Sequence, residues 1–165
     1  MLTLRPATIA DAPLLRRWDD EPHVAAADPN DDWQWETELP KLFPSRELLI
    51  AEVDGVPIGV LQIIDPAEEE SHYWGDVPAN LRAIDIWIGE AAYLGQGYGT
   101  RMMQLAIGRC FAHPAVQAVL IDPLAGNARA IRFYQRLGFR PVEERVFGQD
   151  RCLVHRLERD AWRNG

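Results

Sequence analysis

Several features that define special classes of protein are missing from this sequence. No apolar run approaches the roughly 20 residues that a membrane-spanning helix needs, so no membrane partner is expected. The start of the chain has no basic segment followed by an apolar core, which argues against a signal peptide. Cysteine is scarce, and Cys110 and Cys152 show no metal-ligand spacing. These absences predict a cytoplasmic protein whose two thiols are reduced.

An excess of positive charge is missing as well. Lysine and arginine together number 17 against 25 acidic residues, which gives a formal net charge of −8 at pH 7. A nucleic-acid-binding surface would be basic, so no nucleic-acid partner is expected. Acidic walls attract cations and would suit a small cationic substrate, although the same net charge is typical of an ordinary soluble domain. The acids concentrate in residues 19–38 and 68–76.

A glycine-rich turn is present between a strand-like and a helix-like segment. The turn reads Leu94-Gly95-Gln96-Gly97-Tyr98-Gly99-Thr100; an alternating apolar run precedes it at 83–89 and a helical pattern follows at 101–107. Glycines let the backbone approach an anion closely. A helix N-terminus adds unpaired N–H groups and the positive end of the helix dipole. The turn therefore predicts a phosphate cradle, and the alternative is an ordinary glycine-rich loop.

Two common nucleotide folds do not fit this turn. A P-loop would end in Gly-Lys-Ser/Thr, which the chain lacks here. The Rossmann fingerprint is Gly-x-Gly-x-x-Gly, whereas these glycines alternate as Gly-x-Gly-x-Gly, and too little sequence follows for a dinucleotide fold. The four histidines show no ligand spacing, so no metal is expected.

Apolar periodicity predicts alternating strands and helices within one domain of residues 1–165. Segments 22–34 and 65–81 lack a regular pattern, and the first is expected to be a loop or a short irregular helix. Asp54-Gly55 is a strong hairpin signal. The expected strands are 2–7, 47–53, 57–64, 82–89, 118–121, 140–147 and 151–157, and the expected helices are 11–20, 35–43, 97–112 and 127–137.

A second motif follows about one helix and one strand later. It begins with Asp122-Pro123, continues through Asn127 and Tyr134 on a helical pattern, and ends at Gly138-Phe139. With the glycine-rich turn, it resembles the GCN5-related N-acetyltransferase (GNAT) superfamily, and within it the aminoglycoside 6′-N-acetyltransferases. The resemblance covers nearly the whole chain. It implies an α/β fold of the α+β type, whose central mixed, mostly antiparallel sheet is flanked by helices, and acetyl-CoA as cosubstrate.

The resemblance also implies which residues hold the cosubstrate. The superfamily usually has Arg or Gln where this chain has Leu94, which removes one side-chain donor but leaves the backbone amides. A backbone N–H among residues 86–88, where the central strand of the superfamily is bulged, would polarise the thioester carbonyl. The implied cofactor-binding residues are Trp87, Ile88, Leu94, Gly95, Gln96, Gly97, Tyr98, Gly99, Thr100, Asn127, Ala130 and Tyr134.

Asp85 is the candidate general base. Alternation on strand 82–89 separates it from the isoleucines at 84, 86 and 88. A carboxylate in an apolar strand is costly to bury unless it is paired, and beside an amine it can attract the cation and accept its proton. The alternative is a strand carboxylate held by Arg82. The resemblance makes Asp85 the base or the amine anchor.

Tyr134 is the candidate general acid, because a phenol with a pKa of about 10 can donate a proton to a departing thiolate. The alternative is that Tyr134 only packs beside Ile131 and Leu137. Asn127 can cap the helix that carries Tyr134 and also bind the cofactor arm. The resemblance favours the acid role for Tyr134.

The resemblance places the acceptor substrate among carboxylates and aromatic rings in the acidic segments. Asp122 would be a second ammonium anchor, although Asp before Pro is also an ordinary turn residue. Asp150, or Gln149 beside it, would be a third polar contact from the last hairpin, although Asp at a turn needs no function. Sugar rings would stack on aromatics, which could equally fill the core. Related enzymes carry a Trp pair where this chain has 24–27, so the pocket is changed. The candidate aromatics are Trp33, Trp35, Tyr73 and Trp74.

The leading hypothesis is therefore a cytoplasmic, acetyl-CoA-dependent aminoglycoside 6′-N-acetyltransferase that confers antibiotic resistance, acting as a monomer or homodimer on a small cationic amine. One alternative is an acyltransferase of siderophore synthesis that acts on hydroxylysine-like amines; those relatives tend to have His where this chain has Asp85. A general small-amine or peptide acetyltransferase is another. A non-catalytic acyl-CoA sensor is a fourth, and the intact cradle argues against it.

Overall fold

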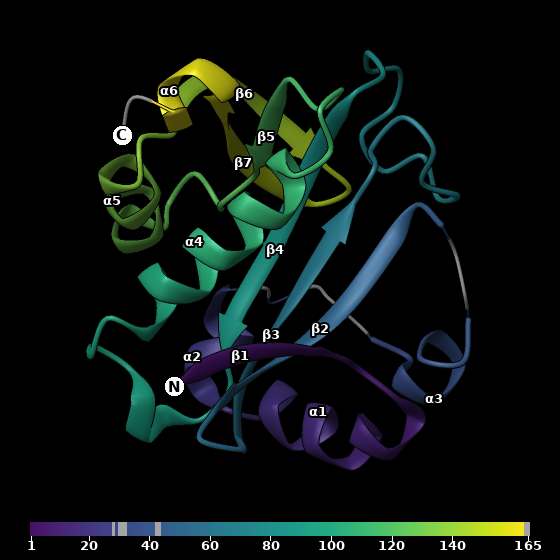
Figure 1. Ribbon diagram of the computed structural model, residues 1–165, viewed down its shortest axis with the longest axis vertical. Coiled ribbons are helices and arrows are strands. Elements are labelled where there is room, and N and C mark those ends of the chain that lie inside the picture. Colours follow the sequence, from purple (N-terminus) through teal and green to yellow (C-terminus); the bar gives the residue numbers. More distant parts are fainter. Residues whose placement is uncertain (28, 30–32, 42–43, 164–165) are drawn as a thin grey trace.

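A computed structural model describes residues 1–27, 29, 33–41 and 44–163. Its centre is a seven-stranded sheet with the strand order β1-β2-β3-β4-β5-β7-β6 (Figure 1). Only β4 and β5 pair in parallel, and all other neighbours are antiparallel. The mixed, mostly antiparallel sheet flanked by helices is thereby confirmed.

The strands and helices follow the expected order along the chain. The strands are β1 (Leu2–Pro6), β2 (Arg46–Val53), β3 (Val56–Ile64), β4 (Leu81–Ile88), β5 (Ala118–Ile121), β6 (Arg140–Phe147) and β7 (Asp150–Glu158). The α-helices are α1 (Ala12–Asp19), α2 (Pro22–Ala27), α3 (Trp35–Glu38), α4 (Tyr98–Phe111), α5 (Ala128–Arg136) and α6 (Arg159–Arg163). Two short 3₁₀ turns are η1 (Ile9–Asp11) and η2 (Ala91–Tyr93).

One expected helix differs from the structure, and one helix of the structure was not expected. The expected helix over 35–43 is the short α3, and residues 42–43 lie outside the described part of the chain. Pro40, which the prediction overlooked, lacks the N–H that a further helical turn needs. The C-terminal α6 was not predicted, because five residues hold too little periodicity to show a helix.

The hairpin signal between β2 and β3 is confirmed. Asp54 and Gly55 have φ values of 50° and 83°, as a type I′ turn requires at both central positions. The turn joins β2 to β3, whose pairing has one register shift, between Ala51 and Glu52. On its other edge, β3 pairs Gly59 to Ile64 with Ile88 to Ala83 of β4 without a register shift.

Alternation along β4 separates two cores, as predicted. Ile84, Ile86 and Ile88 belong to or pack against the apolar cluster beneath α4. Trp87 packs on the opposite face with Trp35 and the residues of α1. Asp85 shares that second face because strand side chains alternate.

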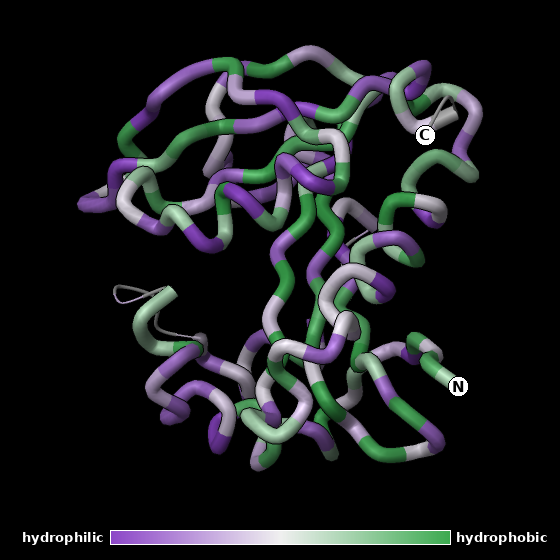
Figure 2. The backbone as a smooth tube through the Cα atoms, turned by 90° about the vertical axis from the view of Figure 1, so that its left-hand side faces the viewer, coloured by the Kyte–Doolittle hydropathy of each residue, from purple (hydrophilic) through white to green (hydrophobic). Residues whose placement is uncertain are grey.

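Strand β4 connects two parts of the sheet that separate beyond a short seam. It pairs with β3 from Ala83 to Ile88, but with β5 only from Leu81 to Ala83. Figure 1 shows β4 crossing from the group β5, β7 and β6 to the group β1, β2 and β3. Turned by 90°, the chain forms an upper and a lower part joined by extended segments (Figure 2). The outer edge of β4 beyond Ala83 therefore faces the place where the sheet divides.

Candidate active site

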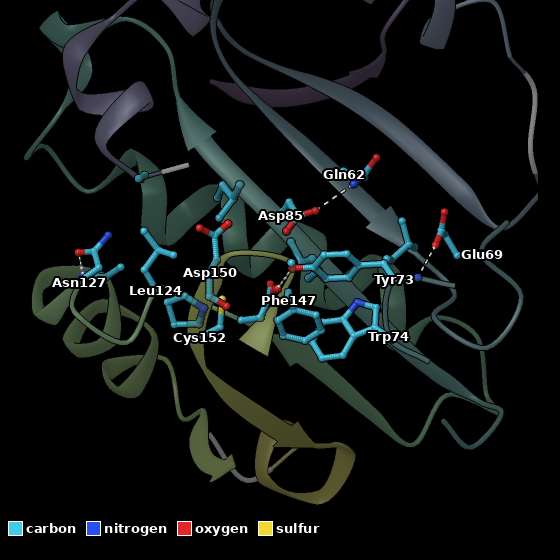
Figure 3. A pocket seen from close by; sticks show the side chains of 18 of the residues that line it. Gln62, Glu69, Tyr73, Trp74, Asp85, Leu124, Asn127, Phe147, Asp150 and Cys152 are labelled. Atoms are coloured by element: carbon cyan, nitrogen blue, oxygen red, sulfur yellow. Dashed lines mark hydrogen bonds between the residues drawn. The ribbon is translucent and has the colours of Figure 1, made fainter. Parts of the chain in front are cut away.

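A cavity of about 640 Å³ lies where β4 and β5 separate. Its lining includes Ile84 and Ile86 from the α4 side of the sheet and Gln62 and Asp85 from the opposite side, so it reaches both faces. Other parts of the wall come from the 65–81 connection, the segment after β5, helix α5 and the β6–β7 hairpin (Figure 3). Ala27, Trp33 and Arg46 also belong to the lining. This volume suits a small-molecule ligand.

Asp85 lies half-buried on β4, in this cavity. Its register partner on β3 is Gln62, whose Nε2 donates a hydrogen bond to Asp85 Oδ2 at 2.9 Å. Arg82 forms its ion pair with Asp65 instead, at 3.3 Å. The candidate base is therefore held by an amide, and Arg82 serves another carboxylate.

Asp122 reaches the same cavity from the segment that follows β5. The Tyr73 hydroxyl donates a 2.6 Å hydrogen bond to Asp122 Oδ2. Burial, followed by the negative charge of Asp122, raises the pKa of Tyr73 far above its usual value, so the phenol stays protonated. The Tyr73 ring stacks on Phe147, with centroids 4.4 Å apart and planes at 7°. Since Phe147 covers one ring face, Tyr73 holds Asp122 and offers at most the other face to a ligand.

Two further carboxylates line the cavity. Asp150 is the first residue of β7, at the predicted hairpin. Glu69, in the 65–81 connection, is 5% exposed and accepts hydrogen bonds from the backbone N–H and hydroxyl of Ser71 at 2.8 and 2.6 Å. Burial alone would raise the pKa of Glu69, but these bonds and one from the Tyr73 backbone lower it. Three predicted acids and one unpredicted acid thus meet in one cavity.

The two acidic segments contribute unequally to this site. Among the residues that the structure describes, the segment 68–76 contributes one acid to the cavity lining, Glu69, and the segment 19–38 contributes none. Asp28, Asp31 and Asp32 of the first segment lie outside those residues.

The four candidate aromatics divide between the cavity and the core. Trp33 and Trp74 line the cavity together with Tyr73. Trp35 is fully buried, so for this residue the core alternative holds. Its ring stacks on Trp33 at 4.8 Å with an interplanar angle of 4°, which supports the wall from behind.

Helix α5 brings two more predicted residues to the cavity. Asn127 Oδ1 accepts from the backbone N–H of Ala130 at 3.1 Å, so Asn127 is the expected N-cap. Asn127, Ala130 and Tyr134 all line the cavity. Tyr134 also contacts the rings of Phe133 and Phe139, with centroids 5.1 and 5.9 Å away. It therefore packs and faces the cavity at once.

The glycine-rich turn lies at the N-terminus of α4, outside the cavity lining. Gly95 and Gly97 have φ values of 71° and 85°, and no atom would lie within 4 Å of a Cβ at either position. A Cβ on Gly99 would meet the Phe133 ring at 3.5 Å, so α5 lies against the first turn of α4. The backbone of the turn is therefore uncovered at Gly95 and Gly97, and the turn lies beside α5.

The outer edge of β4 carries backbone groups that β3 does not use. The Gly89 N–H donates to Ile58 O at 2.8 Å, which fixes the hydrogen-bonding phase of the β3–β4 pair. Because that phase alternates, the N–H groups of Ile86 and Ile88 point away from β3. The Ile88 carbonyl on this edge lies 2.7 Å from His23 Nε2. The register of β3 with β4 runs unbroken here, so the bulge implied by the resemblance is not found in this pairing.

The part of the chain that the structure describes contains neither a metal-binding group nor a membrane-spanning helix. No group of three or more His, Cys, Asp or Glu side chains could hold a metal ion there. No helix in the same residues is long and apolar enough to span a membrane.

Residues 8–147 match a family model described as an acetyltransferase (GNAT) domain. The chain belongs to the GNAT family. The matched residues include the glycine-rich turn, the second motif from Asp122 to Phe139 and most of the residues that line the cavity.

Several GNAT proteins are similar over most of this chain. An aminoglycoside N(6′)-acetyltransferase type 1 from Klebsiella pneumoniae is 29% identical over 147 residues, which cover 84% of this chain and 73% of that protein. A lysine N-acyltransferase, MbtK, from Mycobacterium tuberculosis is 27% identical over 162 residues, covering 94% and 76%. The crystal structure of the aminoglycoside acetyltransferase AAC(6′)-Ib with coenzyme A and kanamycin has a TM-score of 0.89 at 25% identity, covering 99% of this chain and 98% of that chain.

The cavity residues that sequence reasoning missed include two polar ones that matter for the site, Gln62 and Glu69. Gln62 carried a signal, since it is the single polar side chain in the run Val56–Ile64. Glu69 carried none, because it stands in a row of three glutamates, Glu68 to Glu70, that look alike in sequence.

Proposed function

We propose that this GNAT protein transfers the acetyl group of acetyl-CoA to the 6′-amine of an aminoglycoside, which would confer resistance to the antibiotic. The observation that carries the proposal is the meeting of Asp85, Asp122 and Asp150 in one cavity beside Tyr134 and the outer edge of β4. Three carboxylates from three separate segments suit an acceptor with several ammonium groups. The similarity to aminoglycoside acetyltransferases supports the same acceptor class.

Asp85 would bind and deprotonate the reacting amine. Amines of this kind are mostly protonated near neutral pH, and only the neutral amine is a nucleophile. A carboxylate on the cavity wall attracts the ammonium group and accepts its proton, directly or through a water molecule. The hydrogen bond from Gln62 Nε2 to Oδ2, at 2.9 Å, holds this carboxylate on the cavity wall.

Asp122 and Asp150 would anchor other ammonium groups of the same acceptor. Asp122 is oriented by the Tyr73 hydroxyl, which in turn is fixed by stacking on Phe147. Asp150 lines the cavity from the β6–β7 hairpin. Anchors on separate segments would orient the acceptor so that one amine reaches Asp85.

Acetyl-CoA supplies the thioester acyl group, and the residues present fit it. The open backbone at Gly95 and Gly97 and the N-terminus of α4 would hold its phosphates. The N–H groups of Ile86 or Ile88, which point away from β3, would donate to the carbonyl oxygen as negative charge develops there. Tyr134 would give a proton to the departing thiolate sulfur.

A lysine-type acceptor is the second candidate, because MbtK matches 94% of this chain. Such an acceptor carries a carboxylate as well as an amine. Against it, the cationic side chain in the cavity lining is Arg46, which is paired with Glu38 at 2.7 Å. The excess of carboxylates therefore favours a polycation.

A thiol-release assay with acetyl-CoA tests the proposal. The acceptors are kanamycin, tobramycin, an aminoglycoside that lacks the 6′-amine, lysine-type amines and peptides. Turnover that requires the 6′-amine is the expected result. Rejection of every aminoglycoside, with a lysine or peptide amine accepted, would replace the proposed acceptor and leave the family unchanged. Binding of CoA without turnover of any amine would favour the sensor.

A further inference from the structure

Gln62 is a buried amide on an otherwise apolar strand. It is 6% exposed and lies on β3 directly opposite Asp85. Its neighbours on the same face of β3, Val60 and Ile64, are buried and apolar. A glutamine at this position therefore replaces what packing alone would make a leucine, isoleucine or methionine.

The chemistry of the pair fixes how the amide is turned. An ionised carboxylate can only accept hydrogen bonds, so the NH₂ group of Gln62 must face Asp85. Figure 3 shows this orientation, with the nitrogen toward Asp85 and the oxygen directed away. The Oε1 atom is buried and has no hydrogen-bond partner among the described residues.

An amide satisfied on one side only is unfavourable for folding. A buried acceptor without a partner carries the full penalty of its lost hydration, and native proteins leave few such groups. The single hydrogen bond of the Gln62 side chain is donated to Asp85. The benefit that offsets the unfavourable burial of the amide must therefore be an effect on Asp85. A donor beside a carboxylate stabilises its charged form and restricts its rotamer.

We infer that Gln62 is a positioning residue that keeps Asp85 ionised and directed into the cavity, at the expense of fold stability. The inference rests on the proposed function only in making Asp85 the group that meets the amine. An ordinary core residue would behave differently, because its substitution would lower the stability of the fold and leave the titration of Asp85 unchanged.

Other charged and titratable groups share the cavity and will also influence Asp85. Tyr73 is near enough for the charge of Asp85 to affect its titration. The groups that face the cavity are the carboxyls of Glu69, Asp122 and Asp150, the phenols of Tyr73 and Tyr134, the Cys152 thiol and the Arg46 guanidinium. They are unchanged by a substitution at position 62, so a comparison of variants isolates the contribution of the amide.

The substitution Gln62→Met tests the inference, because methionine has a similar length and no donor. The readout is the titration of the Asp85 carboxyl, followed by NMR in protein labelled with ¹³C at aspartate carboxyls and assigned through Asp85→Asn. We expect the midpoint to move upward by about one pH unit, as loss of one hydrogen bond to a charged group implies. The melting temperature should stay the same or rise.

Controls distinguish positioning from structure. Ile63→Met changes the next residue of β3, on the opposite face, and should leave the Asp85 midpoint in place. Gln62→Glu keeps the shape but adds an acid, and the resulting carboxyl pair should move the midpoint further upward. An unmoved midpoint in either Gln62 variant, or a fall in melting temperature with no change in midpoint, would overturn the inference.

The titration needs no substrate, so it stands apart from the proposed function. If the wild-type protein acetylates any amine, the acidic limb of kcat/KM should shift in the same direction as the midpoint in Gln62→Met. If the protein rejects all aminoglycosides, the proposed acceptor fails, while the titration still decides the role of Gln62.

Discussion

Asp85 is the residue on which the proposed reaction depends most. The change Asp85→Asn keeps the shape of the side chain and removes the proton acceptor, so turnover should fall by roughly 100-fold or more. Acetyl-CoA binding, measured by calorimetry, should stay near normal. Asp65→Asn is a matched control, because Asp65 pairs with Arg82 outside the cavity. Unchanged turnover in Asp85→Asn would remove the base role.

The Tyr73 hydroxyl should matter for acceptor binding rather than for chemistry. Tyr73→Phe keeps the ring stacked on Phe147 but removes the bond to Asp122. Loss of a hydrogen bond to a charged group should raise KM for the acceptor by about 10-fold, with kcat little changed. Steady-state kinetics with the best acceptor measures both constants. A fall in kcat at constant KM would instead place Tyr73 in the chemical step.

Asp11 makes the stability of the fold depend on pH at the start of α1. It is 6% exposed, accepts two hydrogen bonds from Arg5 and caps the turn through the Thr8 N–H. The bond from Arg5 is the main reason that the pKa of Asp11 is lowered. The stabilisation is therefore complete above the unfolded pKa of about 3.9 and is lost as the pH falls through the lower folded value.

The variant Asp11→Asn tests this linkage. It should lower the free energy of unfolding by about 1–3 kcal/mol near neutral pH. The difference from wild type should shrink on the acid side, where Asp11 is protonated in both states. Urea unfolding of both proteins near neutral pH and at a pH below the folded pKa of Asp11 measures the difference in free energy of unfolding. An equal difference at both would show that shape rather than charge is responsible.

Sequence reasoning found the acids Asp85, Asp122 and Asp150 because a motif or a break in an apolar pattern marked each of them. Sequence reasoning could not identify the side chains that donate hydrogen bonds to these acids. The partners Gln62 and Tyr73 are 23 and 49 residues away from the acids that they contact. Those contacts follow from strand register and loop packing, which residue patterns do not encode locally.

Helix α1 packs closely against the end of β4 because the residue there, Gly89, has no side chain. A Cβ on Gly89 would lie 2.0 Å from the Trp18 ring, which is fully buried. Gly89→Ala should therefore destabilise the protein by about 1–3 kcal/mol, as overpacking does. The matched control is Gly108→Ala in α4, where nothing lies within 4 Å and alanine should stabilise by about 0.5–1 kcal/mol. Thermal unfolding of both variants checks the pair, and equal effects would contradict it.

Elements with a clear period or a strong turn were predicted well, and short ones were not. Strands β2 and β3 and their hairpin follow from alternation and from Asp54-Gly55. Helix α3 was overestimated because the pattern continues past Pro40. Helix α6 has five residues, fewer than two helical turns.

The acidic charge of the chain should show in how salt affects binding. With a net charge of −8 and four carboxylates in the cavity, a polycationic acceptor should bind more weakly as ionic strength rises. KM for the aminoglycoside should increase several-fold between low and high salt. KM for acetyl-CoA, an anion, should not increase in parallel. Parallel increases for both substrates would contradict a specific role of the acidic cavity.

The division of the sheet could not be read from the sequence. Strands β4 and β5 both have strong apolar patterns, yet they pair only from Leu81 to Ala83. How far two strands stay paired depends on twist and on the helices that pack against them. The cavity is a product of that geometry.

The strand order also sets when, during synthesis, this protein can begin to work. β7 is made after β6, yet it inserts between β5 and β6 and carries Asp150. Until the ribosome has released it, β5 keeps an open edge and the cavity lacks a wall. A nascent chain that ends before β7 already holds Asp85, the glycine-rich turn and Tyr134, but it lacks Asp150 and one wall of the cavity.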